Sequence, residues 1–114
     1  MLGLDMLRSV GKLGLLLMLC MAPAVYASSQ EEAVKLARDK VCLGCHQIDK
    51  PRVGPHFKAI AERYKDASDE IVTYLAQAIR TGGRGRWGVI PMPAQPQISE
   101  EDALTLARWI RSLK

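Results

Sequence analysis

Two cysteines and a histidine share one short segment, Cys42-Leu43-Gly44-Cys45-His46. Two thiols at this spacing lie on one turn and reach the two vinyl groups of a single porphyrin, with which they form thioethers. The adjacent imidazole then points a ring nitrogen at the iron. This C-x-x-C-H spacing is the attachment motif of c-type haem, so it predicts one covalent haem c, bound through Cys42 and Cys45, with His46 on the metal.

Three other interpretations of the two thiols are weaker. A disulfide between residues so close in sequence is strained and leaves His46 unexplained. A thioredoxin-like redox pair requires a βαβ context, and the sequence shows no strand pattern. A zinc or thiol module requires four ligands, and the chain has no second C-x-x-C.

The iron of an electron carrier is usually held on both faces, and two side chains are candidates for the second position. Met92 lies between Pro91 and Pro93, which stiffen the backbone and present the sulfur with little entropy to lose. His56 is the alternative, but it follows a proline at an expected helix start, where we expect it to face solvent. We therefore favour Met92, since His/Met ligation raises the haem potential.

The N-terminal region has the pattern of a secretory signal peptide. Basic residues precede an apolar run that is shorter than the roughly 20 residues needed to span a bilayer. Val25 and Ala27 then occupy the −3 and −1 positions of a small-residue cleavage site. We expect residues 1–27 to be removed and 28–114 to form one domain in a bacterial periplasm; cleavage after Ala24 and an uncleaved anchor are the alternatives.

Composition limits what this domain can be. The chain has 114 residues, 16 Lys+Arg against 12 Asp+Glu, and only 5% aromatic residues. This length excludes a two-domain enzyme, and the scattered basic residues argue against nucleic-acid binding. A domain this small with few aromatics has a thin core, so we expect the haem to supply its apolar centre.

Helical periodicity and turn residues predict an all-α domain. A start signal precedes each apolar helical pattern, and glycines and prolines mark the intervening loop. The expected elements are a helix from Ser28 and Ser29, a second after Pro55, a third from Ser68 to Gly82, a loop over 82–98, and a last helix from Ser99 that carries the core residue Trp109.

Several segments together resemble one family. These are residues 42–46, Val53-Gly54-Pro55, Gly85-Arg86-Trp87-Gly88-Val89-Ile90-Pro91-Met92-Pro93 and Leu106-Ala107-Arg108-Trp109-Ile110. They resemble the small bacterial class I cytochromes c, most closely the cytochrome c-551/c-552 type of denitrifying and ammonia-oxidising bacteria.

The resemblance implies a fold of about four helices around one covalent haem, with the terminal helices crossing. It also implies that the Pro55 carbonyl accepts a proton from His46 Nδ1, and that Trp87 donates its indole N–H to a propionate. An ordinary core position is the other interpretation of Trp87.

The function implied is that of a periplasmic one-electron carrier, not an enzyme. Its partners would be a quinol-oxidising complex upstream and a nitrite reductase, cytochrome c peroxidase or terminal oxidase downstream. We expect a monomer that docks transiently, without stable membrane insertion after cleavage. An enzyme or gas sensor with an open haem face is the alternative, and it would need Met92 off the iron.

The sequence departs from the family at a few positions. Ala78 stands where many relatives carry a propionate-pairing arginine, and Arg80, Arg84 and Arg86 are candidates to replace it. Gln95 is the nearest match to an asparagine that bonds the methionine sulfur. Four cations flank the haem motif and form either a partner-steering face or a solvated surface: Lys40, Lys50, Arg52 and Lys58.

Overall fold

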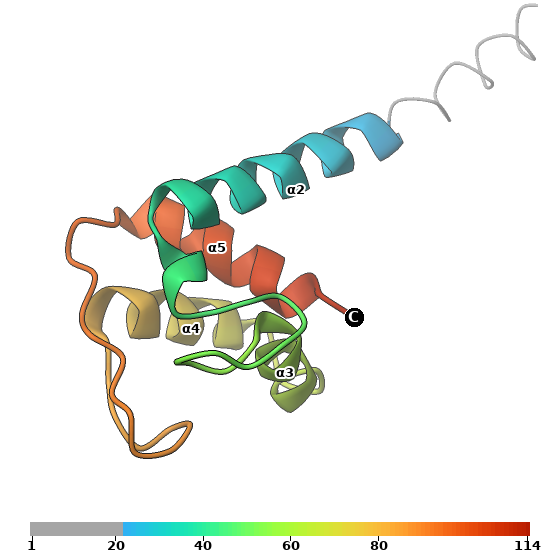
Figure 1. Ribbon diagram of the computed structural model, residues 1–114. Helices are drawn as coiled ribbons and strands as arrows, with labels where there is room; N and C mark the ends of the chain where they lie inside the picture. The colour runs from blue at the N-terminus through green and yellow to red at the C-terminus, as the bar shows by residue number, and fades with distance from the viewer. Residues whose placement is uncertain (1–21) are drawn as a thin grey trace, which may run out of the picture. The chain divides into compact units, whose positions relative to one another are not determined.

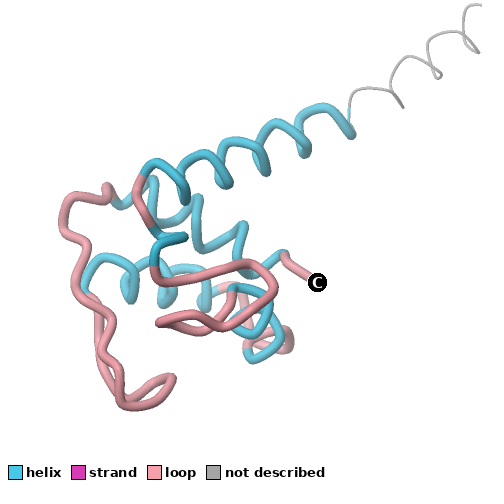
Figure 2. Tube along the Cα trace, viewed as in Figure 1, coloured by secondary structure: helices cyan, strands magenta, loops and turns pink. Residues whose placement is uncertain are grey.

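The computed structural model describes residues 22–114, and Figure 1 shows their helices. The elements are α2 (Ala22–Asp39), the 3₁₀ helix η1 (Cys42–Gly44), α3 (Phe57–Arg63), α4 (Glu70–Thr81) and α5 (Glu100–Ser112). This part of the chain contains no β-strand, only an isolated antiparallel bridge between Gly83 and Met92, so helices and loops account for all of it (Figure 2). The predicted all-α class is confirmed.

The chain divides after Glu32 into two compact units, the second of which spans residues 33–114 and carries the helical fold. Residues 1–21, most of the predicted signal peptide, lie outside the described part. The prediction that the first helix starts at Ser28 and Ser29 is wrong, because α2 already begins at Ala22. Pro23 lies in its first turn, where a missing N–H is tolerated.

The other helix boundaries follow their sequence signals. α4 ends at Gly82, whose φ of 68° is accessible to glycine. The Ser99 side chain accepts a hydrogen bond from the Asp102 N–H at 3.0 Å and so caps α5 as predicted. No helix within residues 22–114 is long and apolar enough to cross a membrane.

α5 is the central helix of the second unit and contacts both α3 and α4. One apolar cluster joins residues of the end of α2, α3 and α5, and includes Ala33, Ala37, Phe57, Ile60, Leu106 and Trp109. A second joins α4 and α5 through Ala76, Ala103 and Ala107 with Ile98. Alanines at these contacts let the helix backbones approach closely. Trp109 is only 7% exposed, so its predicted core position is confirmed.

A long loop, residues 82–98, leaves the end of α4 and returns to the start of α5. The backbone N–H of Gly83 donates to the Met92 carbonyl and that of Met92 to the Gly83 carbonyl, with nitrogen–oxygen distances of 3.0 and 2.8 Å. The Gln95 N–H bonds the Arg80 carbonyl at 3.0 Å, and Arg80 Nε bonds the Ile98 carbonyl at 3.1 Å. The loop is therefore fastened at its base to α4, and its tip extends between Gly83 and Met92.

Candidate haem site

A largely apolar cavity opens between two walls of the second unit. One wall carries η1, the segment after it and α3, with Cys42, Cys45, His46, Pro55, Phe57 and Ile60. The facing wall carries α4 and the 82–98 loop, with Leu75, Ile79, Arg86, Met92 and Gln95. All six predicted site residues line this cavity, including Trp87 at its far end, whereas His56 does not.

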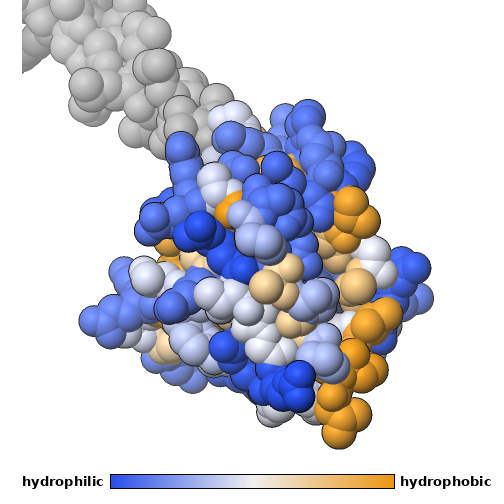
Figure 3. All heavy atoms as spheres, turned by 90° about the vertical axis from the view of Figure 1, so that its left-hand side faces the viewer, coloured by the Kyte–Doolittle hydropathy of each residue, from blue (hydrophilic) through white to orange (hydrophobic). Residues whose placement is uncertain are grey.

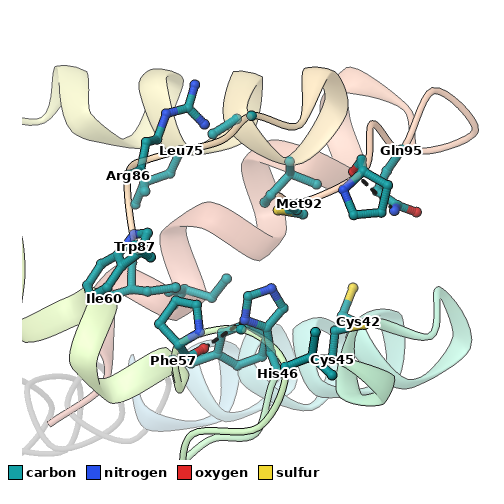
Figure 4. A pocket seen from close by; sticks show the side chains of 18 of the residues that line it. Cys42, Cys45, His46, Phe57, Ile60, Leu75, Arg86, Trp87, Met92 and Gln95 are labelled. Carbon is teal, nitrogen blue, oxygen red and sulfur yellow. Dashed lines mark hydrogen bonds between the residues drawn. The ribbon is translucent and has the colours of Figure 1, made fainter. Parts of the chain in front are cut away.

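The two cysteines lie together at one end of the cavity (Figure 4). η1 places them on a single tight turn, in which the His46 N–H bonds the Cys42 carbonyl at 2.9 Å. No disulfide joins them, and burial raises the pKa of the Cys42 thiol. Reactive redox cysteines need a lowered pKa, so this environment does not support a thioredoxin-like pair.

Val41, directly before this turn, has an uncommon backbone. Its φ is 62° and its ψ 22°, a left-handed conformation that is a genuine outlier for a β-branched residue. Its side chain is 72% exposed and lies at the rim of the cavity. Packing therefore offsets little of the backbone strain.

The His46 ring is held from two sides. Its Nδ1 lies 2.7 Å from the Pro55 carbonyl, and because that oxygen can only accept, Nδ1 carries the proton. Phe57 stacks on the ring with centroids 5.2 Å apart, and Phe57 in turn meets Trp109 edge to face at 5.4 Å. With Nδ1 occupied, Nε2 is the nitrogen left to bind a metal, and the ring points into the cavity (Figure 4).

Gly54 is a residue of the site whose role sequence reasoning missed. A Cβ at this position would lie 2.6 Å from Cε1 and 2.9 Å from Nδ1 of His46, closer than real Cβ atoms come. The ring therefore rests against backbone that only glycine provides. The signal was present in the Val53-Gly54-Pro55 segment, but spacing alone does not show which atoms approach.

Met92 faces His46 from the opposite wall (Figure 4). Its backbone runs against Gly82, where a Cβ would lie 2.5 Å from the Met92 carbonyl oxygen. Gly82 also has φ 68° and ψ −162°, a region that is essentially restricted to glycine. Gly82 thus ends α4 and also leaves space for the backbone of Met92 to pass close by. The helix-stop signal did not reveal this second role.

The end of the cavity opposite the cysteines carries aromatic and cationic side chains. Trp87 is 37% exposed, so it is not the core residue that was its other interpretation. Of the three arginines that could replace one at position 78, Arg84 and Arg86 line the cavity, while Arg80 does not. Gln95 lines it too, with its amide donating to the Pro93 carbonyl at 3.3 Å.

The donor chemistry of the cavity fits a haem. It is apolar, has two thiols at one end, and presents an imidazole and a thioether on facing walls. A zinc site requires three or four protein ligands, chiefly Cys, His, Asp and Glu. Within residues 22–114, no group of three or more such residues could hold a metal ion. The His46 imidazole and the Met92 thioether could instead hold a haem iron from the two walls.

Known proteins share both the sequence and the fold. The cytochrome c family model matches residues 30–114. The chain is 47% identical to cytochrome c-552 of Nitrosomonas europaea over 79 residues, 69% of this chain and 76% of the relative. It is 44% identical to cytochrome c-551 of Pseudomonas denitrificans over 80 residues, 70% of this chain and 95% of the relative.

A crystal structure of wild-type Nitrosomonas europaea cytochrome c552 superposes with a TM-score of 0.69 at 46% identity. The match covers 71% of this chain and 99% of that one. Fold, attachment motif and sequence thus agree on one covalent haem c, held through Cys42 and Cys45. The chain belongs to the cytochrome c family, as a class I cytochrome c related to the c-551 and c-552 proteins, and is a single-haem electron carrier rather than an enzyme.

Proposed function

We propose that His46 and Met92 are the two axial ligands of the haem iron, and that this protein carries single electrons in the periplasm. The observation that supports the ligand pair is that both side chains point into one cavity from facing walls (Figure 4). His56, the other candidate, sits at the N-cap of α3 and does not line the cavity.

The bound haem supplies a one-electron ferrous–ferric couple. His46 keeps its proton on Nδ1, donated to Pro55, and this bond fixes the tautomer and the ring orientation at the iron. Met92 would hold the iron from the facing wall, and this would leave no site open for a substrate. Trp87 lies at the end far from the cysteines (Figure 4), and its indole N–H would donate to a propionate of the bound haem.

The rim of the cavity suits transient docking. Three apolar side chains at the rim are unusually exposed: Val41 at 72%, Val53 at 50% and Ile90 at 61%. Hydrophobic side chains also gather along one side of the surface in Figure 3. A small apolar patch permits weak, fast-exchanging contacts of the kind that redox partners make.

Cations close to the haem motif in sequence would add electrostatic steering, and one of the four, Lys40, lines the cavity. Lys58 is paired with Asp49, and Arg52 donates to the Leu43 carbonyl at 3.3 Å while remaining exposed. Lys50 is exposed as well. We therefore propose partners with an acidic rim: a quinol-oxidising complex as donor, and a nitrite reductase, cytochrome c peroxidase or terminal oxidase as acceptor.

The ligand pair is tested by optical spectra of the protein made with the haem-attachment machinery. We expect a sharp reduced c-type spectrum and, in the oxidised protein, the weak far-red band of a sulfur–iron bond. Met92→Ala should abolish that band, whereas the matched variant His56→Ala should keep it. A high-spin spectrum, or a low-spin one without the band, would remove Met92 from the iron and favour an open-site enzyme or sensor.

Export and processing are tested separately. When the full 114-residue chain is expressed, we expect the processed protein to accumulate in the periplasmic fraction with Ser28 as its N-terminus. N-terminal sequencing of the haem-containing protein distinguishes cleavage after Ala27 from cleavage after Ala24. An intact leader on membrane-bound protein would contradict the proposed location.

A further inference from the structure

The 82–98 loop carries Met92, yet almost all its polar contacts hold it from its own side of the cavity. The backbone pair of Gly83 and Met92 is internal to the loop, and Gln95 and Arg80 fasten its base to α4. None of these bonds reaches the wall that carries His46. Within residues 22–114, the polar and cation–π contacts that cross to the His46 wall come from one side chain, Arg63.

Arg63 is the last residue of α3 and makes two contacts with the tip of the loop. Its guanidinium carbon lies 3.3 Å from the centroid of a Trp87 ring. Its Nη1 donates a hydrogen bond of 2.7 Å to the Arg86 carbonyl. The planar guanidinium can thus lie on the indole and still point an N–H at the neighbouring backbone, which an ammonium group cannot do in the same way.

Arg86 continues this connection to the base of the loop. Its guanidinium lies 5.4 Å from the Tyr74 ring on α4, and its Nη1 donates to the Gly82 carbonyl at 3.4 Å. A Cβ at Gly83 would lie 2.8 Å from that Nη1, so glycine leaves the space that Arg86 fills. The tip is therefore joined to α3 through Arg63 and to α4 through Arg86.

We propose that Arg63 is a positioning residue for Met92: it holds the loop tip against α3 and so keeps the Met92 wall closed over the cavity. The inference rests on the proposed His46/Met92 ligation. The cysteines fasten the haem at one end of the cavity, and Trp87 lies at the other (Figure 4). Arg63 thus closes the end that has no covalent attachment, and its loss lets the loop open more often.

The test uses the haem-containing protein with Arg63→Ala and Arg63→Lys. Imidazole binds ferric iron only after Met92 has left, so its binding rate reports loop opening. We expect Arg63→Ala to bind about 5-fold faster, equivalent to about 1 kcal/mol at 1.4 kcal/mol per tenfold. Arg63→Lys should also be faster, because the charge remains but the stacked plane is lost.

Arg108→Ala is the matched control. Arg108 is an exposed arginine on α5 that does not line the haem cavity, and within residues 22–114 it makes no polar or cation–π contact with the 82–98 loop. The substitution removes the same charge, so it should leave the imidazole rate unchanged. A wild-type rate in Arg63→Ala or Arg63→Lys, or an equal increase in Arg108→Ala, would overturn the proposal.

Hydrogen exchange separates failure of this proposal from failure of the ligand assignment. The Gly83 and Met92 amides bond each other's carbonyls, so their exchange reports loop opening whatever ligand the iron has. Faster exchange in Arg63→Ala but not in Arg108→Ala supports the role of Arg63 even if the far-red band is absent. Unchanged exchange at both amides in Arg63→Ala, with the band present, rejects that role and leaves the His46/Met92 proposal intact.

Discussion

Gly82→Ala should damage the Met92 side of the site more than any other single-methyl change in the loop. The backbone at Gly82, with φ 68° and ψ −162°, costs a residue other than glycine about 1–3 kcal/mol. The added Cβ would also lie 2.5 Å from the Met92 oxygen and 2.8 Å from the Pro93 carbonyl carbon. Because both are backbone atoms, the loop backbone at Met92 and Pro93 must shift.

This shift would break the two backbone hydrogen bonds between Gly83 and Met92, each of which contributes about 1 kcal/mol. We therefore expect Gly82→Ala to lower the free energy of unfolding by about 4 kcal/mol in total. That is a large share of the stability of a small domain. The assay is denaturant unfolding of the ferric protein, with the far-red band followed in parallel.

Gly85→Ala is the matched control for this experiment. Gly85 has a φ of 81°, but nothing lies within 4 Å of the position that an added methyl would take, so only the backbone penalty of about 1–2 kcal/mol applies. The band should persist in Gly85→Ala and weaken or disappear in Gly82→Ala. Equal unfolding free energies for the two variants would refute the argument that the close approach to Met92 matters.

Three further predictions concern the opposite wall and the whole domain. Gly54→Ala should displace the His46 ring and weaken its bond to Pro55, because the new Cβ would lie 2.6 Å from Cε1; a changed low-spin spectrum and shifted His46 NMR signals would report this, and unchanged signals would contradict it. Val41→Gly should raise the free energy of unfolding by less than about 1 kcal/mol, because relief of about 1–2 kcal/mol of left-handed strain is partly offset by the greater freedom of glycine in the unfolded chain; a less stable variant would show that Val41, which lines the cavity, contributes contacts there. The haem-free chain 28–114 should be largely unfolded, and near-native helicity by circular dichroism would disprove this.

The parts of the fold that sequence predicts are those with local causes. The cap of α5 is predictable because a serine before three acidic residues is a strong helix-start signal. The end of α4 at Gly82 is predictable because the left-handed backbone that ends a helix favours glycine. Cys42, Cys45 and His46 are recognisable because attachment chemistry fixes their spacing. Each of these inferences needs only a few neighbouring residues.

The features that sequence did not predict depend on contacts between distant segments, or on a backbone conformation that the residue type disfavours. Gly54 against His46 and Gly82 against Met92 are close approaches that no periodicity encodes. Val41 contradicts its own propensity, so no local rule predicts its left-handed backbone. Arg63 looks like an ordinary solvated arginine at a helix end, and only the fold brings Trp87 onto its guanidinium.

The two walls of the site are therefore held by different means. The His46 ring is fixed by a hydrogen bond to Pro55, by the Gly54 backbone and by stacked Phe57, which belongs to the apolar cluster that includes α5. Met92 is fixed by a loop whose backbone pair is braced by exposed arginines. Exposed contacts are weaker than buried ones and open more readily. Because the two proposed ligands come from walls of such unequal rigidity, opening of the site should begin on the Met92 side, while the cysteines and His46 retain the haem on the other.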